Sequence, residues 1–311
     1  RHNPKETTRR AYTRIYEHIP PSLPTNKMFL CPGGGRKEKK VYSDPNQPRR
    51  FANQKKEGDT RALDIDALYD GKELKGKVCL VTGANRGLGF AIASELVAKG
   101  AKVVATCRKS KPEIKGLTKV IDGIDVTSDE SMEKLVKDLE GQEIDILVNN
   151  AGYFLTEPET IDKPNFPEEI KMIDICALGP LRVTSALFKA KLLKKGSKVA
   201  MITSQGGSIA WRDVQNANGP FDYGHHMSKA AANMMGKLLA IELGKEGVMV
   251  SILHPGFNRT DMTSKYKHIW DVEGAVDSSV GAKRVCHEII QMTPQTAGKF
   301  INCEDGLQIP W

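Results

Sequence analysis

Three glycines could bind the phosphates of a dinucleotide: Gly83, Gly87 and Gly89, in the stretch TGANRGLG. An apolar run rich in β-branched residues, Val78–Thr82, comes directly before them, and apolar residues recur at three- and four-residue steps over Phe90–Gly100. The pattern predicts a strand, a glycine turn and a helix. Glycine lets the backbone approach a ligand closely, and the helix N-terminus attracts a pyrophosphate. A dinucleotide site is therefore predicted at this loop. The loop also contains Thr82, Asn85, Arg86 and Leu88.

The elements that must position this loop alternate along the chain from Gly76 onward. Strand-like runs are followed by helix-like segments, which is typical of a parallel sheet covered on both faces. We therefore predict an α/β fold, a Rossmann-type doubly wound parallel sheet of seven strands. The predicted strands are Val78–Thr82, Lys102–Cys107, Thr118–Ile121, Ile144–Val148, Lys198–Thr203, Val248–Leu253 and Lys299–Ile301. Later helices are predicted at residues 131–139, with Ser128 as N-cap, and at 168–193, 223–243 and 279–291, with loops at 205–222 and 256–276.

Four short motifs stand in order, each at the carboxyl end of a predicted strand, where open α/β sheets bind ligands. They are Thr82–Gly89, Asp125-Val126, Asn149–Gly152 and Pro255-Gly256. Together they resemble the pattern of the short-chain dehydrogenase/reductase family over residues 76–311. The stretches 254–262 and 298–311 look closest to the branch that contains the sniffer-type carbonyl reductases and the C-factor-like proteins.

The resemblance implies a role for each residue of the cofactor site. The three glycines admit the pyrophosphate. Asn150, in the run Asn150-Ala151-Gly152, positions the sugar of the cofactor and the central strands. Asp125 and Val126 match positions that contact adenine. Thr260, which follows Pro255-Gly256, matches a residue that reaches the carboxamide and a phosphate, and Lys229 matches one that holds the ribose.

Cofactor choice depends on the end of the second strand, where an acid would bind the ribose hydroxyls of NAD. The sequence there is Thr106-Cys107-Arg108-Lys109, without an acid, and Arg86 adds a cation from the glycine loop. Guanidinium groups suit a 2′-phosphate. The sequence therefore favours NADP(H) over NAD(H), unless Arg108 and Lys109 form only a solvated loop face.

The family reduces a carbonyl with a hydride from the nicotinamide and a proton from a tyrosine, assisted by a lysine, a serine and an asparagine. Ser204 and Lys229 match two of these four positions. The tyrosine position, four residues before Lys229, holds His225, and the asparagine position holds Cys176. Two of the four implied catalytic positions thus depart from the family pattern. No residues have the spacing of a metal site.

Two residues could supply the missing proton. Imidazole has a reference pKa of about 6.5, but Lys229 on the same helix face makes the imidazolium form of His225 scarcer. Tyr223 lies about 240° around a regular helix from Lys229, so it reaches the site only if the helix starts late. Cys176 is expected to be a small buried thiol rather than a nucleophile.

Two functional hypotheses follow from these substitutions. The first is a weak or inactive carbonyl reductase that is kept as a structural or regulatory subunit of a larger assembly. The second is an active NADPH-dependent reductase of aldehydes or ketones, with His225 or Tyr223 as the proton donor.

Residues 1–75 are predicted to be a basic N-terminal extension, ahead of the dinucleotide-binding domain at 76–311. Residues 1–56 contain 14 Lys and Arg against 4 Asp and Glu, and Gly33–Gly35 is interpreted as a linker. We expect the extension to be disordered, or ordered by lying on its own domain or on a neighbour. Its charge predicts an anionic partner; RNA, an acidic protein subunit and a membrane surface fit equally well.

The amino-acid composition favours some cellular compartments over others. Six scattered cysteines indicate free, mostly buried thiols in a reducing compartment, and the absence of an 18-residue apolar run argues against a membrane span. We expect an intracellular protein, soluble or peripheral. A chain that starts at Arg1 fits both a removed plastid or mitochondrial targeting peptide and a trimmed sequence. The resemblance also implies a homodimer through the helices at 168–193 and 223–243, although monomers occur in the family.

Overall fold

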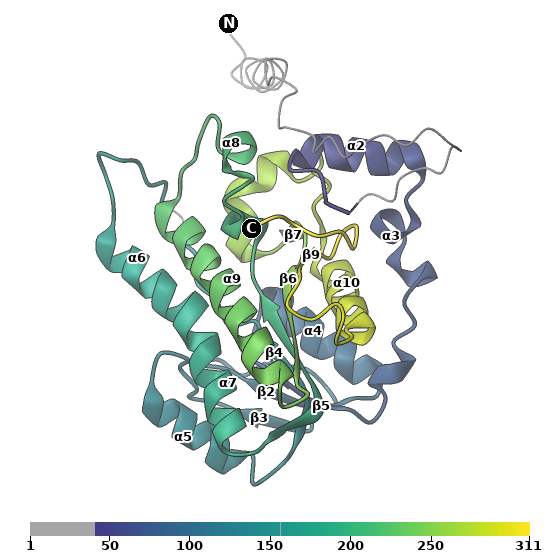
Figure 1. The fold of residues 1–311 in the computed structure, drawn as a ribbon, viewed down its shortest axis with the longest axis vertical. Coiled ribbons are helices and arrows are strands. Elements are labelled where there is room, and N and C mark those ends of the chain that lie inside the picture. The colour runs from purple at the N-terminus through teal and green to yellow at the C-terminus, as the bar shows by residue number, and fades with distance from the viewer. Residues whose placement is uncertain (1–40, 156) are drawn as a thin grey trace, which may run out of the picture.

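The computed structural model describes residues 41–155 and 157–311, which fold around a parallel sheet of seven strands (Figure 1). The strands are β1 (Val78–Val81), β2 (Lys102–Thr106), β3 (Lys119–Ile121), β4 (Ile144–Asn149), β5 (Leu193–Ile202), β6 (Met249–His254) and β9 (Phe300–Asn302). Their spatial order is β3-β2-β1-β4-β5-β6-β9. The predicted doubly wound sheet is confirmed. Strand ends differ from prediction by one residue, except that β5 begins five residues earlier.

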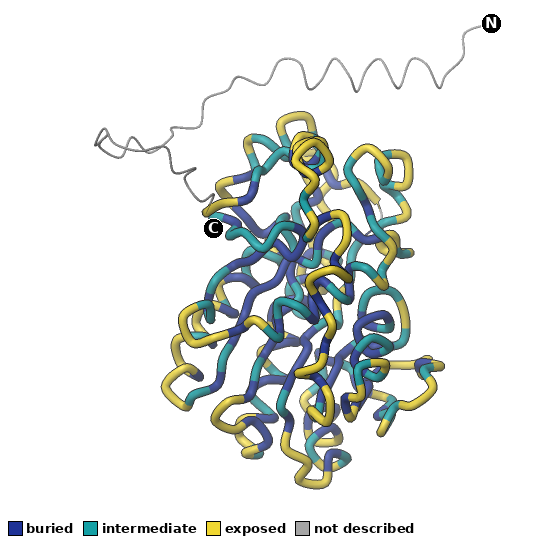
Figure 2. The backbone as a smooth tube through the Cα atoms, turned by 90° about the vertical axis from the view of Figure 1, so that its right-hand side faces the viewer, coloured by how far each residue is buried: buried dark blue, intermediate teal, exposed yellow. Residues whose placement is uncertain are grey.

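Both faces of the sheet are buried. Successive residues of a strand point to opposite faces, so each strand contributes side chains to two separate cores. Leu80 and Leu147 belong to one apolar core, whereas Val81 and Val148 belong to the other. The first core is covered by α5 (Asp129–Asp138), α7 (Gly179–Lys189) and α9 (Tyr223–Gly244), and the second by α4 (Gly87–Ala98) and α10 (Ser278–Gln291). Figure 2 shows the buried strands inside the domain and the exposed residues on its outer loops and helix surfaces.

Local signals set the ends of several helices. Ser128 caps α5 as predicted, since its Oγ accepts the N–H of Ser131 at 3.1 Å. The segment predicted as a loop at 256–276 is more ordered than expected. It contains a short strand pair, β7 (Asn258–Arg259) with β8 (Val276–Asp277), and a 3-10 helix, η5 (Asp261–Ile269).

The long helix predicted over 168–193 is interrupted in its middle. It comprises α6 (Phe166–Ile173), a π-helical turn at Asp174–Leu178 and α7. Pro180 has no N–H to donate to the carbonyl of Cys176, and its ring would crowd that carbonyl, so a regular α-helix is disfavoured at this point. The wider turn accommodates the proline and places Cys176 at an irregularity of a kind that is frequent at functional sites.

Residues 41–75 lie on the domain that follows them. Tyr42 forms a bridge with Gln308, and the chain continues through α2 (Gln47–Glu57) and α3 (Thr60–Leu63). Farther on, the side chains of Ile65, Tyr69 and Leu74 are buried in the core beneath α4 and α10. Of the expected alternatives, order on its own domain therefore applies to this part of the extension. The predicted linker Gly33–Gly35 lies outside the described residues.

The described cysteines are all free and buried, as expected; they are Cys79, Cys107, Cys176, Cys286 and Cys303. Within residues 41–155 and 157–311, no helix is long and apolar enough to cross a membrane.

Candidate active site

The glycine loop joins β1 to α4 and leaves its backbone open to an anion. Gly83 and Gly87 have φ of 66° and 57°, left-handed values that favour glycine. The N-cap residue of α4, Arg86, makes no capping hydrogen bond with its side chain, so the first N–H groups and the positive dipole end of the helix are not satisfied by this residue. Leu88 packs against the core, and Arg86 is exposed. This arrangement fits a pyrophosphate.

Asn150 holds the glycine loop against the end of β4. Its Nδ2 donates to the carbonyl oxygens of Thr82 and Gly83 at 3.0 and 3.2 Å. The Thr82 hydroxyl accepts the backbone N–H groups of Asn150 and Ala151, both at 3.0 Å. A Cβ on Gly89 would lie 2.2 Å from Asn150 Nδ2, so only glycine fits there. Asn150 therefore fixes the shape of the loop through both its side chain and its backbone.

Arg108 and Asp125 lie at the predicted adenosine end, after β2 and β3. Arg108 Nη1 is 3.6 Å from Asp125 Oδ2, and the Arg108 side chain is 57% exposed. Burial raises the pKa of Asp125, but hydrogen bonds from Thr127 and the charge of Arg108 outweigh it, so the pKa is lowered overall. Asn85 Nδ2 donates to Ser110 Oγ at 2.9 Å, which ties the glycine loop to the loop that carries Arg108.

Space remains beside this end of the site. A hollow of about 650 Å³ is lined in part by Arg108, Thr127 and Asp174. Val126 itself is buried, and a Cβ on Gly179 would lie 2.7 Å from its Cγ2. Asp125 and Arg108 are more accessible to solvent than Val126, with side chains 33% and 57% exposed.

The loop after β6 closes over the glycine loop. Gly256 has a φ of 82°, and Asn258 Nδ2 donates to the carbonyl oxygens of Pro255 and Gly256 at 3.2 and 3.0 Å. Thr260 caps η5. A Cβ on Gly87 would lie 3.8 Å from Thr260 Cβ, so the structure brings Thr260 to the phosphate-binding turn.

Ser204 and His225 face one another across Gly206. A Cβ on Gly206 would lie 3.0 Å from His225 Nε2 and 3.2 Å from Ser204 Oγ. Ser204 Oγ accepts the N–H of Gly206 at 3.0 Å, which leaves the hydroxyl hydrogen free to point elsewhere. Both side chains therefore lie close to Gly206, after the carboxyl end of β5.

The surroundings of His225 keep its ring neutral. Phe154 packs edge-on against it, with ring centroids 4.7 Å apart, and His225 Nδ1 is buried with no hydrogen-bond partner among the described residues. Burial lowers the pKa of His225 well below its usual 6.5, and the positive charge of Lys229 acts in the same direction. An imidazolium that could donate a proton is therefore scarce at neutral pH.

Lys229 lies one turn after His225 in α9. Its backbone carbonyl packs close to Gly207, where an added Cβ would lie 2.6 Å from the oxygen. The described residues supply no hydrogen-bond or ion-pair partner for its ammonium group. That group is therefore available to a ligand.

The family model of the short chain dehydrogenases matches residues 77–269. The chain belongs to the short-chain dehydrogenase/reductase family. It is 34% identical over 239 residues to a 1-hydroxy-2-glutathionyl-2-methyl-3-butene dehydrogenase of Rhodococcus sp. (strain AD45). The aligned region covers 75% of this chain and 98% of that protein. This is a family of NAD(P)-dependent oxidoreductases, and the expectation drawn from the four motifs is confirmed.

Solved structures share the fold. A 3-oxoacyl-[acyl-carrier protein] reductase from Brucella melitensis in complex with NAD is 27% identical, with a TM-score of 0.65 over 76% of this chain and 99% of the other. The carbonyl reductase Sniffer of D. melanogaster superimposes with a TM-score of 0.62 over 76% of this chain and 100% of the other, at 22% identity. At this identity the likeness shows the shared fold alone.

Tyr223 is not placed to replace the family's tyrosine. The sequence-based hypothesis required α9 to start late, but the helix begins at Tyr223 itself. Tyr223 therefore projects from a different helix face than Lys229. Its ring stacks on Phe221, with centroids 6.2 Å apart. Of the two proposed donors, only His225 lies beside Ser204.

Cys176, at the family's asparagine position, is occupied by backbone contacts. Its Sγ accepts the N–H of Tyr153 and its thiol donates to the carbonyl of the same residue, both at 3.4 Å. Cys176 is 3% exposed, and a Cβ on Gly152 would lie 3.9 Å from its sulfur. These contacts support the interpretation as a buried thiol.

Sequence reasoning missed the residues that enclose His225. Lys265 Nζ lies 4.1 Å from the centre of the Phe154 ring and 3.4 Å from Asp222 Oδ2. Asp222 also accepts the hydroxyl of Tyr266 at 3.0 Å, and it adopts a left-handed φ of 39° directly before α9. No local pattern could reveal this cluster, because η5 meets the start of α9 only in the folded chain.

Proposed function

We propose that this protein binds NADP(H) and is a weak or inactive carbonyl reductase that serves as a structural or regulatory subunit of a larger assembly. The single observation that carries the proposal is the contrast within one site. The glycine loop, Asn150 and Lys229 would suit a dinucleotide, whereas the position that the resemblance assigns to the proton donor holds a neutral, largely buried imidazole.

The residues present fit the cofactor. The left-handed glycines, the uncapped end of α4 and the tight approach at Gly89 suit a pyrophosphate. Arg108 and Arg86 are exposed guanidinium groups that suit a 2′-phosphate. Lys229 would hold the ribose hydroxyls beside the nicotinamide. When bound, the cofactor would supply a hydride.

The weakness of catalysis follows from His225. Reduction of a carbonyl needs a proton at the oxygen, and Ser204 can orient that oxygen through its free hydroxyl hydrogen. His225 donates efficiently only as imidazolium, and its lowered pKa makes that form rare near neutral pH. General acid catalysis typically contributes about 10²–10⁴-fold in rate, so the loss is large.

An active aldehyde or ketone reductase is the alternative, and one observation favours it. His225 Nε2 and Ser204 Oγ both lie close to Gly206, so one carbonyl oxygen bound beside that glycine could contact both. In that case His225, rather than Tyr223, is the proton donor. The rate would rise as the pH falls, because protonation of the ring limits turnover.

Two measurements on the purified chain separate these functions. Calorimetric titration with NADPH and NADH tests cofactor binding, and NADPH oxidation against a panel of aldehydes and ketones tests turnover. Tight NADPH binding without turnover supports the first proposal. Turnover that increases towards acidic pH supports the alternative. Failure to bind either dinucleotide would overturn both.

A further inference from the structure

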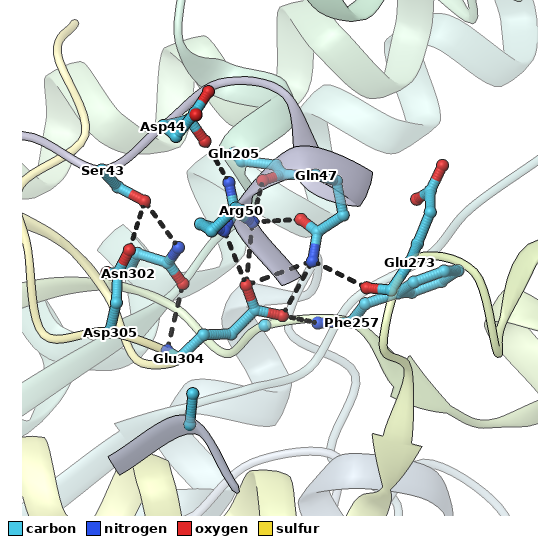
Figure 3. A network of polar contacts seen from close by, with 12 residues as sticks. Ser43, Asp44, Gln47, Arg50, Gln205, Phe257, Glu273, Asn302, Glu304 and Asp305 are labelled. Carbon is cyan, nitrogen blue, oxygen red and sulfur yellow. Dashed lines mark hydrogen bonds and ion pairs between the residues drawn. The ribbon is translucent and has the colours of Figure 1, made fainter. Parts of the chain in front are cut away.

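A buried ion pair joins the N-terminal segment to the candidate active site (Figure 3). Arg50, on α2, and Glu304, which follows β9, lie 2.8 Å apart between Arg50 Nη2 and Glu304 Oε2. Their side chains are 3% and 4% exposed. Gln47 Nε2 donates to both Glu304 oxygens at 3.2 Å and to the carbonyl of Glu273 at 3.0 Å. The network thus fastens α2 to the carboxyl edge of the sheet.

Glu304 supports the loop after β6. Its Oε1 accepts the N–H of Phe257 at 3.0 Å, and a Cβ on Gly256 would lie 2.6 Å from its Cγ. Burial raises the pKa of Glu304, but the charge of Arg50 and the Phe257 hydrogen bond help to lower it to about 2. The carboxylate is therefore ionised at neutral pH. Arg50 is the ion-pair partner of this carboxylate and helps to balance its charge, together with Arg284.

Arg50 also reaches the loop that carries Ser204. Its Nη2 donates to Gln205 Oε1 at 3.2 Å. The backbone of Gln205 is held from the other side by Arg212, whose Nη2 donates to the Gln205 carbonyl at 3.0 Å. The Arg50 guanidinium lies 5.8 Å from the ring centre of the buried Trp211. One guanidinium therefore contacts the Ser204 loop directly, through Gln205, and the Pro255-Gly256 loop indirectly, through Glu304.

We propose that Arg50 is a positioning residue, which holds the Ser204 loop and the Pro255-Gly256 loop in register for NADP(H). It lies outside residues 77–269, the stretch that matches the family, so this chain adds its own support to a common site. The inference rests on the proposed function, since it concerns binding of that cofactor. It also revises the charge assignment of the extension, because Arg50 and its neighbour Arg49, paired with Asp44, are already engaged within the chain.

The geometry predicts a split between the two ends of the cofactor. Arg50 is linked to the Ser204 loop through Gln205 and to the Pro255-Gly256 loop through Glu304, and none of its contacts within the described part of the chain is with the glycine loop or Arg108. Loss of Arg50 should therefore lower the affinity for NADPH. It should leave unchanged the affinity for adenosine 2′,5′-bisphosphate, which lacks the nicotinamide half. General destabilisation of the domain would not separate the two ligands in this way.

The test uses calorimetric titration of the full chain with both ligands. Arg50→Lys keeps the charge that compensates Glu304 but removes the fork that reaches both loops. We expect NADPH affinity to fall by at least about fivefold, the usual effect of one lost hydrogen bond, with adenosine 2′,5′-bisphosphate unchanged. Arg49→Lys is the matched control, since Arg49 is the preceding residue of α2 and its side chain is 60% exposed. It should change neither affinity.

Gln205→Leu provides a second variant, because it breaks only the bond to Arg50 and leaves the ion pair intact. It should show the same split, and the double variant should lose little more than the worse single variant, since both remove one link. Equal NADPH affinity in the wild type and both single variants would overturn the inference, as would parallel loss of both ligands. If the wild type binds neither ligand, it is the proposed function that fails.

Discussion

Gly89→Ala tests whether the glycine loop is shaped by the packing seen here. The Cβ added by this change would lie 2.2 Å from Asn150 Nδ2 and 2.4 Å from the Gly83 carbonyl oxygen. Neither neighbour can move freely. Asn150 Nδ2 donates to the carbonyls of Thr82 and Gly83, and the backbone N–H of Asn150 is tied to the Thr82 hydroxyl. The loop must therefore shift or lose these bonds.

The cost can be estimated from three contributions. Overpacking a tight site costs about 1–3 kcal/mol. Each of the two Asn150 side-chain hydrogen bonds is worth about 1 kcal/mol if lost. The higher helix propensity of alanine offsets up to about 1 kcal/mol of this destabilisation, because glycine is the poorer helix former. We therefore expect the free energy of unfolding to fall by about 2–4 kcal/mol, which leaves the protein folded if its stability is typical. A displaced loop should also weaken NADPH at least about tenfold, or about 1.4 kcal/mol.

Urea unfolding followed by circular dichroism measures the first effect, and calorimetric titration the second. Gly244→Ala is the matched control. This glycine ends α9, and nothing lies within 4 Å of where its Cβ would be. It should leave stability within about 1 kcal/mol and NADPH affinity unchanged. Wild-type stability and affinity in Gly89→Ala would refute the packing argument.

Three further changes test the site and its setting. The double variant His225→Tyr with Cys176→Asn should raise NADPH-dependent turnover by at least about 100-fold; NADPH binding without turnover would mean that the substrate pocket is also lost. Burial lowers the pKa of His254 from 6.5 to about 4, so the unfolded chain takes up a proton first as the pH falls. Stability should therefore decline between pH 6.5 and 4, by about 3 kcal/mol more in the wild type than in His254→Asn, as urea unfolding at each pH would show. Equal losses would mean that the ring is not held neutral. Leu238, 58% exposed on α9, should lie in a homodimer interface; sedimentation should show a dimer that Leu238→Lys converts to monomer, and a monomeric wild type would rule the interface out.

Most of the fold could be predicted from the sequence, because its strands and helices follow from local patterns of residues. The strands are apolar runs, the glycine loop has a fixed place between a strand and a helix, and Ser128 has the chemistry of an N-cap. Thr260 could be placed near the glycine loop only through the family resemblance. The structure then supplies the contact, with Gly87 as its neighbour.

Other features depend on distant partners and could not be inferred. Arg50 lies in a polar, basic segment that composition assigns to solvent, yet its buried partner Glu304 is 254 residues away. The π-helical turn follows from Pro180, but Gly179-Pro180 alone does not say whether a helix bends, breaks or widens. The enclosure of His225 requires η5, a segment in which the sequence predicts only a loop.

The proposed binding function cannot rest on the glycine loop alone. Gly89 and Asn150 hold the ends of β1 and β4 together, so both would be needed for folding even in a chain that binds nothing. Lys229 is different. Among the described residues its ammonium group has no partner, so neither packing nor an ion pair explains why a cation stands there. A bound ligand with ribose hydroxyls would give this group a partner. Lys229 is therefore the residue that best distinguishes a working dinucleotide site from a scaffold that merely keeps the fold of one.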